Sequence, residues 1–265
     1  TVVELGPGGG NLEIGQKVYV SARELPVRAG CYAEYIAVPQ HALFRLYADS
    51  DLEAAACLSN YQVAWHLLHT ATRGAPGKTV LIYSASGGLG SAAVQLAQLA
   101  GMTAIAVVST PEKASALQEF GANHVIDVSR EDVAARVHEI THGIGVDLIL
   151  DAIGGNSFAG NLAMLAPFGL VVSYGRLQGG LETNLVAALS NGPGYLNSGA
   201  VRVFTMHTLD DKPLLRAESM NYLIARLAER KIRPLIHARL PLSQARRAHE
   251  MLEAREVIGK ILLKP

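Results

Sequence analysis

Short runs of β-branched and other apolar residues alternate with longer amphipathic stretches through the middle of the chain. The apolar runs have the length of buried strands and cover residues 80–83, 104–108, 124–126, 146–151 and 170–174. The stretches between them carry apolar residues at helical spacing, at residues 112–120, 131–141 and 157–165. Strands separated by helices pair in parallel through right-handed crossovers. The pattern therefore predicts an α/β fold with a doubly wound parallel sheet.

The two ends of the chain show a different pattern. Three short alternating runs, separated by Gly and Pro turns, lie at residues 2–5, 18–20 and 31–39. Near the other end, Ser243 is placed as the N-cap of an amphipathic helix, and a final strand is predicted at residues 258–263. We expect these segments to form part of a smaller β-rich domain.

A glycine-rich turn joins the first predicted strand of the sheet to its helix. Residues 85–90 read Ala-Ser-Gly-Gly-Leu-Gly, which is G-x-G-x-x-G with alanine in the first position. Gly87 has no Cβ, so a pyrophosphate can approach the backbone, and Gly90 lets the helix pack closely on the strand. The helix N-terminus offers unpaired N–H groups and a positive dipole end. A tight turn that binds nothing is the alternative, but the strand–turn–helix context favours a dinucleotide site.

The residues after the second predicted strand bear on which dinucleotide is bound. An NAD site places an acidic residue there to bond the ribose 2′-hydroxyl. This chain instead has Ser109 and Thr110, with Lys113 one turn further on. A carboxylate would repel a 2′-phosphate, whereas hydroxyls and a lysine attract it, so NADPH is favoured over NADH. The alternative is that Lys113 is a solvated lysine on the face of a helix.

Composition narrows the classes of protein. The chain has 265 residues, 49% of them hydrophobic, and equal numbers of basic and acidic residues, 23 of each, so no basic field is available to bind nucleic acid. Cys31 and Cys57 are too few for a disulfide framework and lack zinc-ligand spacing, which fits a reducing cytoplasmic setting. No apolar run is long enough for a membrane span, and no leader is apparent. We expect a soluble cytoplasmic protein with no membrane or nucleic-acid partner.

Several segments together resemble the zinc-independent quinone oxidoreductase group of the medium-chain dehydrogenase/reductase superfamily. The resemblance runs over nearly the whole chain and rests on "AEYIAVP", "SASGGLGSAAVQLA", "PEKASALQEFGANHVID", "VDLILDAIGG", "LAPFGLVVSYG" and "LSQARRAHEMLEAREVIGKILLKP". It implies a partial GroES-like substrate domain at residues 1–55, a Rossmann NADP-binding domain at residues 56–215, and a segment at residues 216–265 that returns to the first domain. It also implies hydride transfer from NADPH to a quinone, an enone or an enoyl thioester.

The resemblance also implies a set of cofactor-binding residues in the turn, after the strands and near the nicotinamide. They are Ala85, Ser86, Gly87, Gly88, Leu89, Gly90, Ser109, Thr110, Lys113, Arg130, Ala152, Ile153, Gly154, Tyr174, Gly175, Arg176, Phe204 and Met206. Ligands of open α/β sheets bind beyond the carboxyl ends of the strands, which independently points to the same crevice. Tyr61 is the phenol that the resemblance places near the reacting face, where it would donate a proton or a hydrogen bond; the alternative is a packed helix aromatic.

This chain departs from the family pattern in several places. The family's opening segment has no counterpart in the sequence, so we expect activity of this chain alone to be impaired. Val63 replaces a threonine, and Val128 replaces an aromatic residue that helps to hold the 2′-phosphate, so Lys113 is expected to rely on Arg130. Ser59 falls where zinc enzymes of the superfamily place a ligand cysteine, so no metal is expected.

Two functions of different classes remain open. The first is an NADPH-dependent oxidoreductase acting on a small molecule, a quinone or an α,β-unsaturated carbonyl compound. The second is a catalytically incomplete NADPH-binding protein or sensor. Residues 201–208 alternate strongly and are predicted to lie at the sheet edge, where an unpaired strand invites a second copy, so a homodimer is expected.

Overall fold

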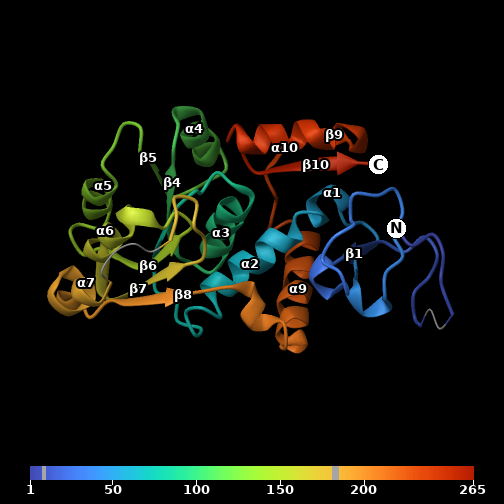
Figure 1. The fold of residues 1–265 in the computed structure, drawn as a ribbon, viewed down its shortest axis with the longest axis horizontal. Helices are drawn as coiled ribbons and strands as arrows, with labels where there is room; N and C mark the ends of the chain where they lie inside the picture. Colours follow the sequence, from blue (N-terminus) through green and yellow to red (C-terminus); the bar gives the residue numbers. More distant parts are fainter. Residues whose placement is uncertain (8–9, 181–184) are drawn as a thin grey trace. The chain divides into compact units, whose positions relative to one another are not determined.

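The structure is a computed structural model that describes residues 1–7, 10–180 and 185–265 (Figure 1). The chain divides into two compact units. Unit 1 comprises Thr1–Gln62 and Leu214–Pro265, and unit 2 comprises Val63–Pro213. Unit 1 is therefore discontinuous in sequence, and unit 2 is formed by one continuous stretch.

Unit 2 is built on one six-stranded sheet, all of whose strand pairs are parallel. In chain order the strands are β3 (Thr79–Ile82), β4 (Thr103–Val108), β5 (His124–Asp127), β6 (Val146–Asp151), β7 (Leu165–Ser173) and β8 (Ala200–Val203). Across the sheet their order is β5-β4-β3-β6-β7-β8, so the strand order reverses between β3 and β6. This is the doubly wound order of dinucleotide-binding folds, and the predicted fold class is confirmed.

Helices connect the strands of this sheet and cover its two faces. They are α3 (Gly88–Leu99), α4 (Pro111–Glu119), α5 (Val133–Ile140), η3 (Gly155–Ala159), α6 (Gly160–Ala163), α7 (Leu185–Asn191), α8 (Pro193–Leu196) and η4 (Met206–Leu209). Right-handed crossovers place α3 and α4 on one face and α5 and α6 on the other, because the direction of strand addition reverses after β5. On the second face, Val137 and Leu162 pack with strand residues such as Leu81 and Ile149 in one buried cluster.

The region before β7 differs from the sequence prediction. The helix expected at residues 157–165 is a short 3₁₀ turn followed by one turn of α-helix, and β7 begins at Leu165 rather than at residue 170. Val146 pairs with Leu165 but Leu148 pairs with Leu170, so β7 advances five residues while β6 advances two. The irregularity contains Phe168 at φ 64°. Proline and glycine beside Phe168 interrupt the apolar pattern. The pattern therefore did not predict that the strand begins at Leu165.

Unit 1 contains two small sheets and several helices. β1 (Val18–Val20) pairs antiparallel with β2 (Leu43–Arg45), and β9 (Ile236–Pro241) pairs parallel with β10 (Lys260–Lys264). The helical elements are η1 (Ala22–Glu24), η2 (Gln40–Ala42), α1 (Leu52–Ala55), α9 (Pro213–Ala228), η5 (Leu242–Gln244) and α10 (Ala245–Glu253). α2 (Leu58–Leu68) begins in unit 1 and ends in unit 2, and α9 starts one residue before the chain re-enters unit 1.

Three sequence predictions in unit 1 are wrong. Residues 2–5 and 31–39 form no strand in the part of the chain that the structure describes, and Tyr32 and Tyr35 within the second stretch are exposed. Alternation yields a strand only where a neighbouring strand pairs with its N–H and C=O groups. Ser243 lies inside η5, and the N-cap of α10 is Gln244, which makes no side-chain capping bond.

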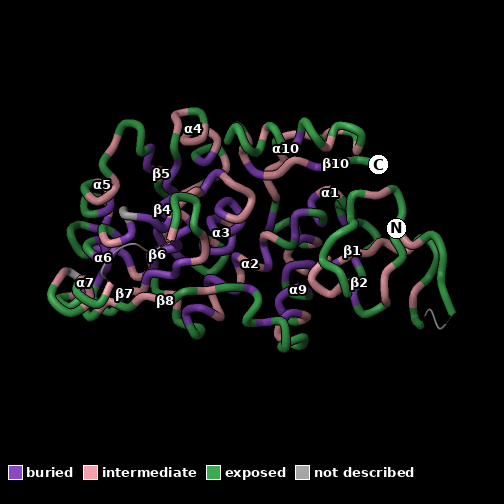
Figure 2. Tube along the Cα trace, in the orientation of Figure 1, coloured by how far each residue is buried: buried purple, intermediate pink, exposed green. Residues whose placement is uncertain are grey.

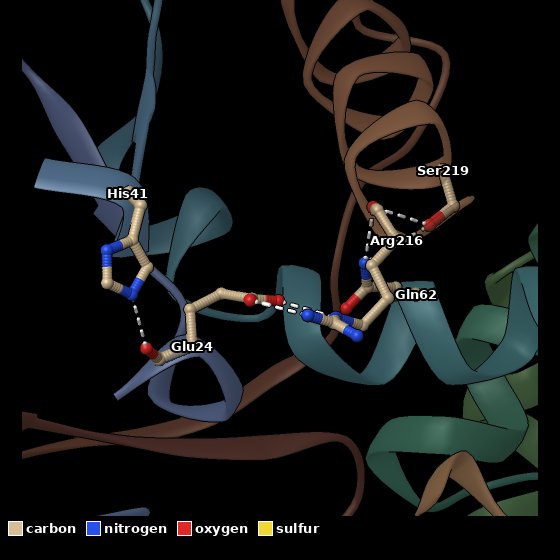
Figure 3. A network of polar contacts seen from close by, with 5 residues as sticks. All are labelled: Glu24, His41, Gln62, Arg216 and Ser219. Atoms are coloured by element: carbon tan, nitrogen blue, oxygen red, sulfur yellow. Dashed lines mark hydrogen bonds and ion pairs between the residues drawn. The ribbon is translucent and has the colours of Figure 1, made fainter. Parts of the chain in front are cut away.

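A polar network, buried at Gln62, Arg216 and Ser219, ties the two sequence segments of unit 1 together (Figure 3). The Arg216 guanidinium donates from Nε and Nη2 to the two oxygens of Glu24, at 2.6 Å each, and the two side chains are only 7% and 14% exposed. The Gln62 amide donates to the carbonyl of Arg216 at 2.8 Å and to the hydroxyl of Ser219 at 3.1 Å. His41 contacts the Glu24 carbonyl oxygen at 3.2 Å. Helix α9 is thereby fixed to η1 and α2.

Burial is uneven along the chain (Figure 2). The strands of unit 2 and the inner face of α3 are buried, whereas much of the first segment of unit 1 is exposed or half-buried.

The helices within the described ranges are all too short or too polar to cross a bilayer.

Candidate functional site

The glycine-rich turn lies between β3 and α3, next to the point where strand order reverses. Ser84 adopts φ 55°, which turns the chain, and the Ala85 N–H donates to the Val107 carbonyl of β4 at 3.1 Å. Gly87 is the N-cap of α3 and provides no side-chain capping bond. The first N–H groups of this 12-residue helix are therefore not capped by a side chain, which is the arrangement that binds anions at helix N-termini.

Glycine is needed for different reasons at the two key positions of the turn, 87 and 90. A Cβ on Gly90 would lie 2.3 Å from the Ser84 carbonyl oxygen and 2.6 Å from Ala85 Cα, so only glycine fits there. The predicted close packing of helix on strand is confirmed at this position. A Cβ on Gly87 would meet its nearest neighbour, the Ser84 oxygen, at 3.4 Å, an ordinary contact. The protein itself leaves room at Gly87, so a need for glycine there would come from a ligand.

The end of β4 carries hydroxyl and ammonium groups. Thr110 caps α4 by accepting a hydrogen bond from the Lys113 backbone N–H at 3.3 Å. The Lys113 ammonium donates to the Ser109 hydroxyl at 3.4 Å, so the positive charge lies over the end of the strand. These three predicted residues are brought together, and α4 adds the positive end of its dipole.

Two carboxylates that the sequence pattern did not point to, Asp127 and Glu112, lie near this group. Asp127 ends β5, opposite Val108 of β4, and is 5% exposed. Its Oδ1 accepts hydrogen bonds from the Ser129 N–H and hydroxyl, and its Oδ2 lies 3.9 Å from Nε of Arg130. The pKa of Glu112 is lowered by its own backbone N–H and the Thr110 hydroxyl, with a further contribution from Arg130. Arg130 is therefore near negative charge at Asp127 and helps to lower the pKa of Glu112. The position of Asp127 at the end of an apolar run was the signal in the sequence.

The loops after β6 and β7 are joined to each other. The Leu177 N–H donates to the Ala152 carbonyl at 3.2 Å, and the Gln178 N–H donates to the Ile153 carbonyl at 2.9 Å. A Cβ on Gly175 would lie 2.6 Å from the Ala152 oxygen, so these backbones are in close contact. The predicted residues of the two loops, Ala152, Ile153 and Gly154 with Tyr174, Gly175 and Arg176, are therefore neighbours beyond the carboxyl ends of adjacent strands.

The remaining predicted residues are placed as follows. Phe204 follows β8, and its N–H donates to the Ser173 carbonyl at 2.9 Å, which puts it beside the end of β7. Met206 begins η4 and is 8% exposed. Tyr61 belongs to unit 1, where it is 1% exposed on α2, and burial raises its pKa. The phenol of Tyr61 thus keeps its proton, and its proposed role stays a prediction.

The metal prediction is not tested by the structure. Within the described ranges, no three or more His, Cys, Asp or Glu side chains are grouped closely enough to hold an ion.

Comparison with known proteins adds to this geometry. The family model described as zinc-binding dehydrogenase matches residues 88–213. The chain is 31% identical to a 2-haloacrylate reductase of a Burkholderia species, covering 100% of this chain and 78% of that protein. It is 32% identical to a quinone oxidoreductase of Pseudomonas aeruginosa, covering 89% of this chain and 72% of that protein. The crystal structure of Escherichia coli quinone oxidoreductase complexed with NADPH superimposes with a TM-score of 0.85 at 28% identity, over 99% of this chain and 79% of that one.

The fold and the glycine turn define a doubly wound α/β protein of the dinucleotide-binding type. The chain belongs to the medium-chain dehydrogenase/reductase superfamily, in the group of the quinone oxidoreductases.

Proposed function

We propose that this chain is an NADPH-dependent oxidoreductase that transfers a hydride to a quinone or to an α,β-unsaturated carbonyl compound, without a metal. The single observation that carries the proposal is the uncapped N-terminus of α3 beside a hydroxyl and ammonium group at the end of β4. Similarity to a quinone oxidoreductase and a 2-haloacrylate reductase supports the reaction class.

The residues present fit NADPH. The turn at residues 85–90 would hold the pyrophosphate on the N–H groups of α3, because the space over Gly87 is not needed by the protein. Ser109, Thr110 and Lys113 would hold the 2′-phosphate by charge-assisted hydrogen bonds. The loops after β6 and β7 lie on the other side of β3 from β4, so they would receive the nicotinamide half.

In hydride transfer the protein mainly positions the two reactants and stabilises the charge that develops. NADPH, when bound, supplies the hydride, and the protein supplies orientation and electrostatics. Burial raises the pKa of Tyr61, so its phenol stays protonated and would contribute a hydrogen bond rather than a negative charge. The paired loops after β6 and β7 would exclude water from the nicotinamide and hold its face.

The proposal is tested by titrating the purified chain with NADPH and NADH by fluorescence and then adding a small quinone and an enone. We expect NADPH to bind more tightly than NADH and to be consumed. Binding of NADPH without consumption across a panel of quinones and enones would favour the alternative, an NADPH-binding protein or sensor. No binding of either nucleotide would reject both.

We further propose a homodimer formed through β8, and the cytoplasm as the compartment. β8 is the last strand of the sheet on its side, so no described strand pairs with the outer N–H and C=O groups of β8, and Val203 at its end is 65% exposed. Sedimentation at micromolar concentration is the test, and a monomer there would reject the dimer.

A further inference from the structure

The Asp151 carboxylate accepts three hydrogen bonds at the carboxyl end of β6. Its Oδ1 accepts from the Ile153 N–H at 2.6 Å and from the Gly154 N–H at 2.9 Å, and its Oδ2 accepts from the Asn161 amide at 2.5 Å. The residue is 2% exposed. A carboxylate that accepts two successive backbone N–H groups fixes the course of the loop that follows it. Asp151 therefore determines how the chain leaves β6.

A further bond connects this group to β3. The Tyr83 hydroxyl donates to Oδ1 of Asn161 at 2.9 Å, and Asn161 is also 2% exposed. Tyr83 directly follows β3, and Asp151 ends β6, so the network spans the point at which strand order reverses. Asn161 joins the two strand ends from α6. Ligands of doubly wound sheets bind beside this point.

The loop that Asp151 fixes is in turn bonded to the loop after β7. Gly154 and Gly155 have φ values of 65° and 67°, and Cβ atoms there would meet the carbonyl oxygens of Gly179 and Gln178 at 2.6 and 2.9 Å. The Gly155 N–H donates to the Gly180 carbonyl at 2.9 Å. The two loops thus form one backbone unit whose position depends on the start of the first loop, which Asp151 holds.

We propose that Asp151 is a positioning residue for the cofactor, acting through the joined loops at residues 152–155 and 174–180 to shape the surface that receives the nicotinamide half. This inference rests on the proposed function. It predicts that losing Asp151 affects the two halves of NADPH differently, because the 2′-phosphate and adenosine would bind over β4, on the other side of β3.

The same strand provides a matched control at its other end. Oδ2 of Asp147 accepts hydrogen bonds from the Lys78 N–H at 2.8 Å and from the Thr79 N–H and hydroxyl at 2.9 Å each. Asp147 and Asp151 are thus the same residue type on β6, each accepting from two backbone N–H groups and one side chain. Only Asp151 lies at the edge where the cofactor is proposed to bind.

The experiment compares Kd values of Asp151→Ala and Asp147→Ala for NADPH and for adenosine 2′,5′-bisphosphate, which lacks the nicotinamide half. For Asp151→Ala we expect the Kd of NADPH to rise at least about tenfold, since the half-buried Ile153 N–H and the buried Gly154 N–H lose their acceptor, and that of the bisphosphate to change less than about twofold. Asp147→Ala should leave both Kd values within about twofold. Asp151→Asn should stay within about threefold of the natural chain, because the amide oxygen still accepts from both N–H groups.

Asn161→Leu is the second variant, chosen because it leaves the Asp151 carboxylate in place if Asp151→Ala fails to fold. It removes the two bonds that Asn161 makes, to Asp151 and to the Tyr83 hydroxyl, and we expect it to raise the Kd of NADPH about threefold without changing that of the bisphosphate. The inference would be overturned if Asp151→Ala or Asn161→Leu raised the Kd of both ligands by the same factor, or left the Kd of NADPH unchanged. It would also be overturned if Asp147→Ala raised the Kd of NADPH as much as Asp151→Ala does. If the natural chain binds both ligands and the Kd values of every variant match those of the natural chain, only this inference fails; if the natural chain binds neither ligand, the proposed function fails with it.

Discussion

Replacing Gly90 by alanine tests the packing of α3 on β3 most directly. The added Cβ would lie 2.3, 2.6 and 2.9 Å from three backbone atoms of Ser84 and Ala85, and backbone cannot move aside as a flexible side chain can. Forcing atoms into a packed core costs about 1–3 kcal/mol, and contacts this short favour the upper end. Alanine regains about 1 kcal/mol of helix propensity over glycine. The net loss for Gly90→Ala is therefore about 2 kcal/mol in the free energy of unfolding.

Thermal unfolding followed by circular dichroism is the assay. A loss of about 2 kcal/mol lowers Tm by about 4–8 °C for a unit of this size. Gly87→Ala is the control, because its Cβ would meet the Ser84 oxygen at 3.4 Å and its φ of −75° suits alanine. The Tm of that variant should lie within about 4 °C of the natural chain's, since alanine is a poorer N-cap than glycine. Its NADPH binding should be weaker. Equal Tm values for Gly90→Ala and the natural chain would refute the packing argument.

Three further predictions concern charges and thiols. Lys113→Ala should raise the Kd of NADPH about tenfold and leave that of NADH within about twofold in fluorescence titrations, since only NADPH carries the 2′-phosphate. Glu24→Gln should lower the free energy of unfolding by about 3–5 kcal/mol in urea denaturation, because Arg216 is left buried without its anion; an unchanged midpoint would contradict this. Burial raises the pKa of the Cys57 thiol to about 11, above its ordinary value of 9.0, so the stability that the neutral thiol contributes is present below pH 9.0 and is lost as the pH rises through about 11. Alkylation at mildly alkaline pH, followed by mass spectrometry, should therefore modify exposed Cys31 well before Cys57.

The fold of unit 2 was predictable because its central strands, β3, β4 and β6, are buried on both faces. Residues 146–151 were predicted with the bounds that β6 has, since Val146 and the apolar residues 148–150 form a run of the length of a buried strand. The start of β7 was missed because the chain bulges at Phe168, next to a proline and a glycine. In unit 1, the alternation at residues 31–39 was misleading. A strand forms only where the fold supplies a neighbouring strand to pair with it, and the alternation of one segment does not show whether it does.

The candidate site was predictable where local chemistry requires particular residues. The glycine turn and the group of Ser109, Thr110 and Lys113 follow strand ends that the apolar pattern had already located. Asp127 and Asp151 were missed, because each ends an apolar run and looks like the boundary of a strand. Their roles depend on neighbours brought close by the fold, such as Asn161.

The bond between Glu24 and Arg216 joins residues 192 positions apart, and the whole of unit 2 is synthesised between them. At ordinary elongation rates of 5–20 residues per second, about 10–40 s separate the appearance of the two partners on the ribosome. Throughout that interval the first segment of unit 1 has neither α9 nor β9 and β10 to pack against, while the six strands of unit 2 become available in sequence. The order of synthesis therefore favours folding of unit 2 before unit 1, and the segment Thr1–Gln62 is among the last to reach its native contacts.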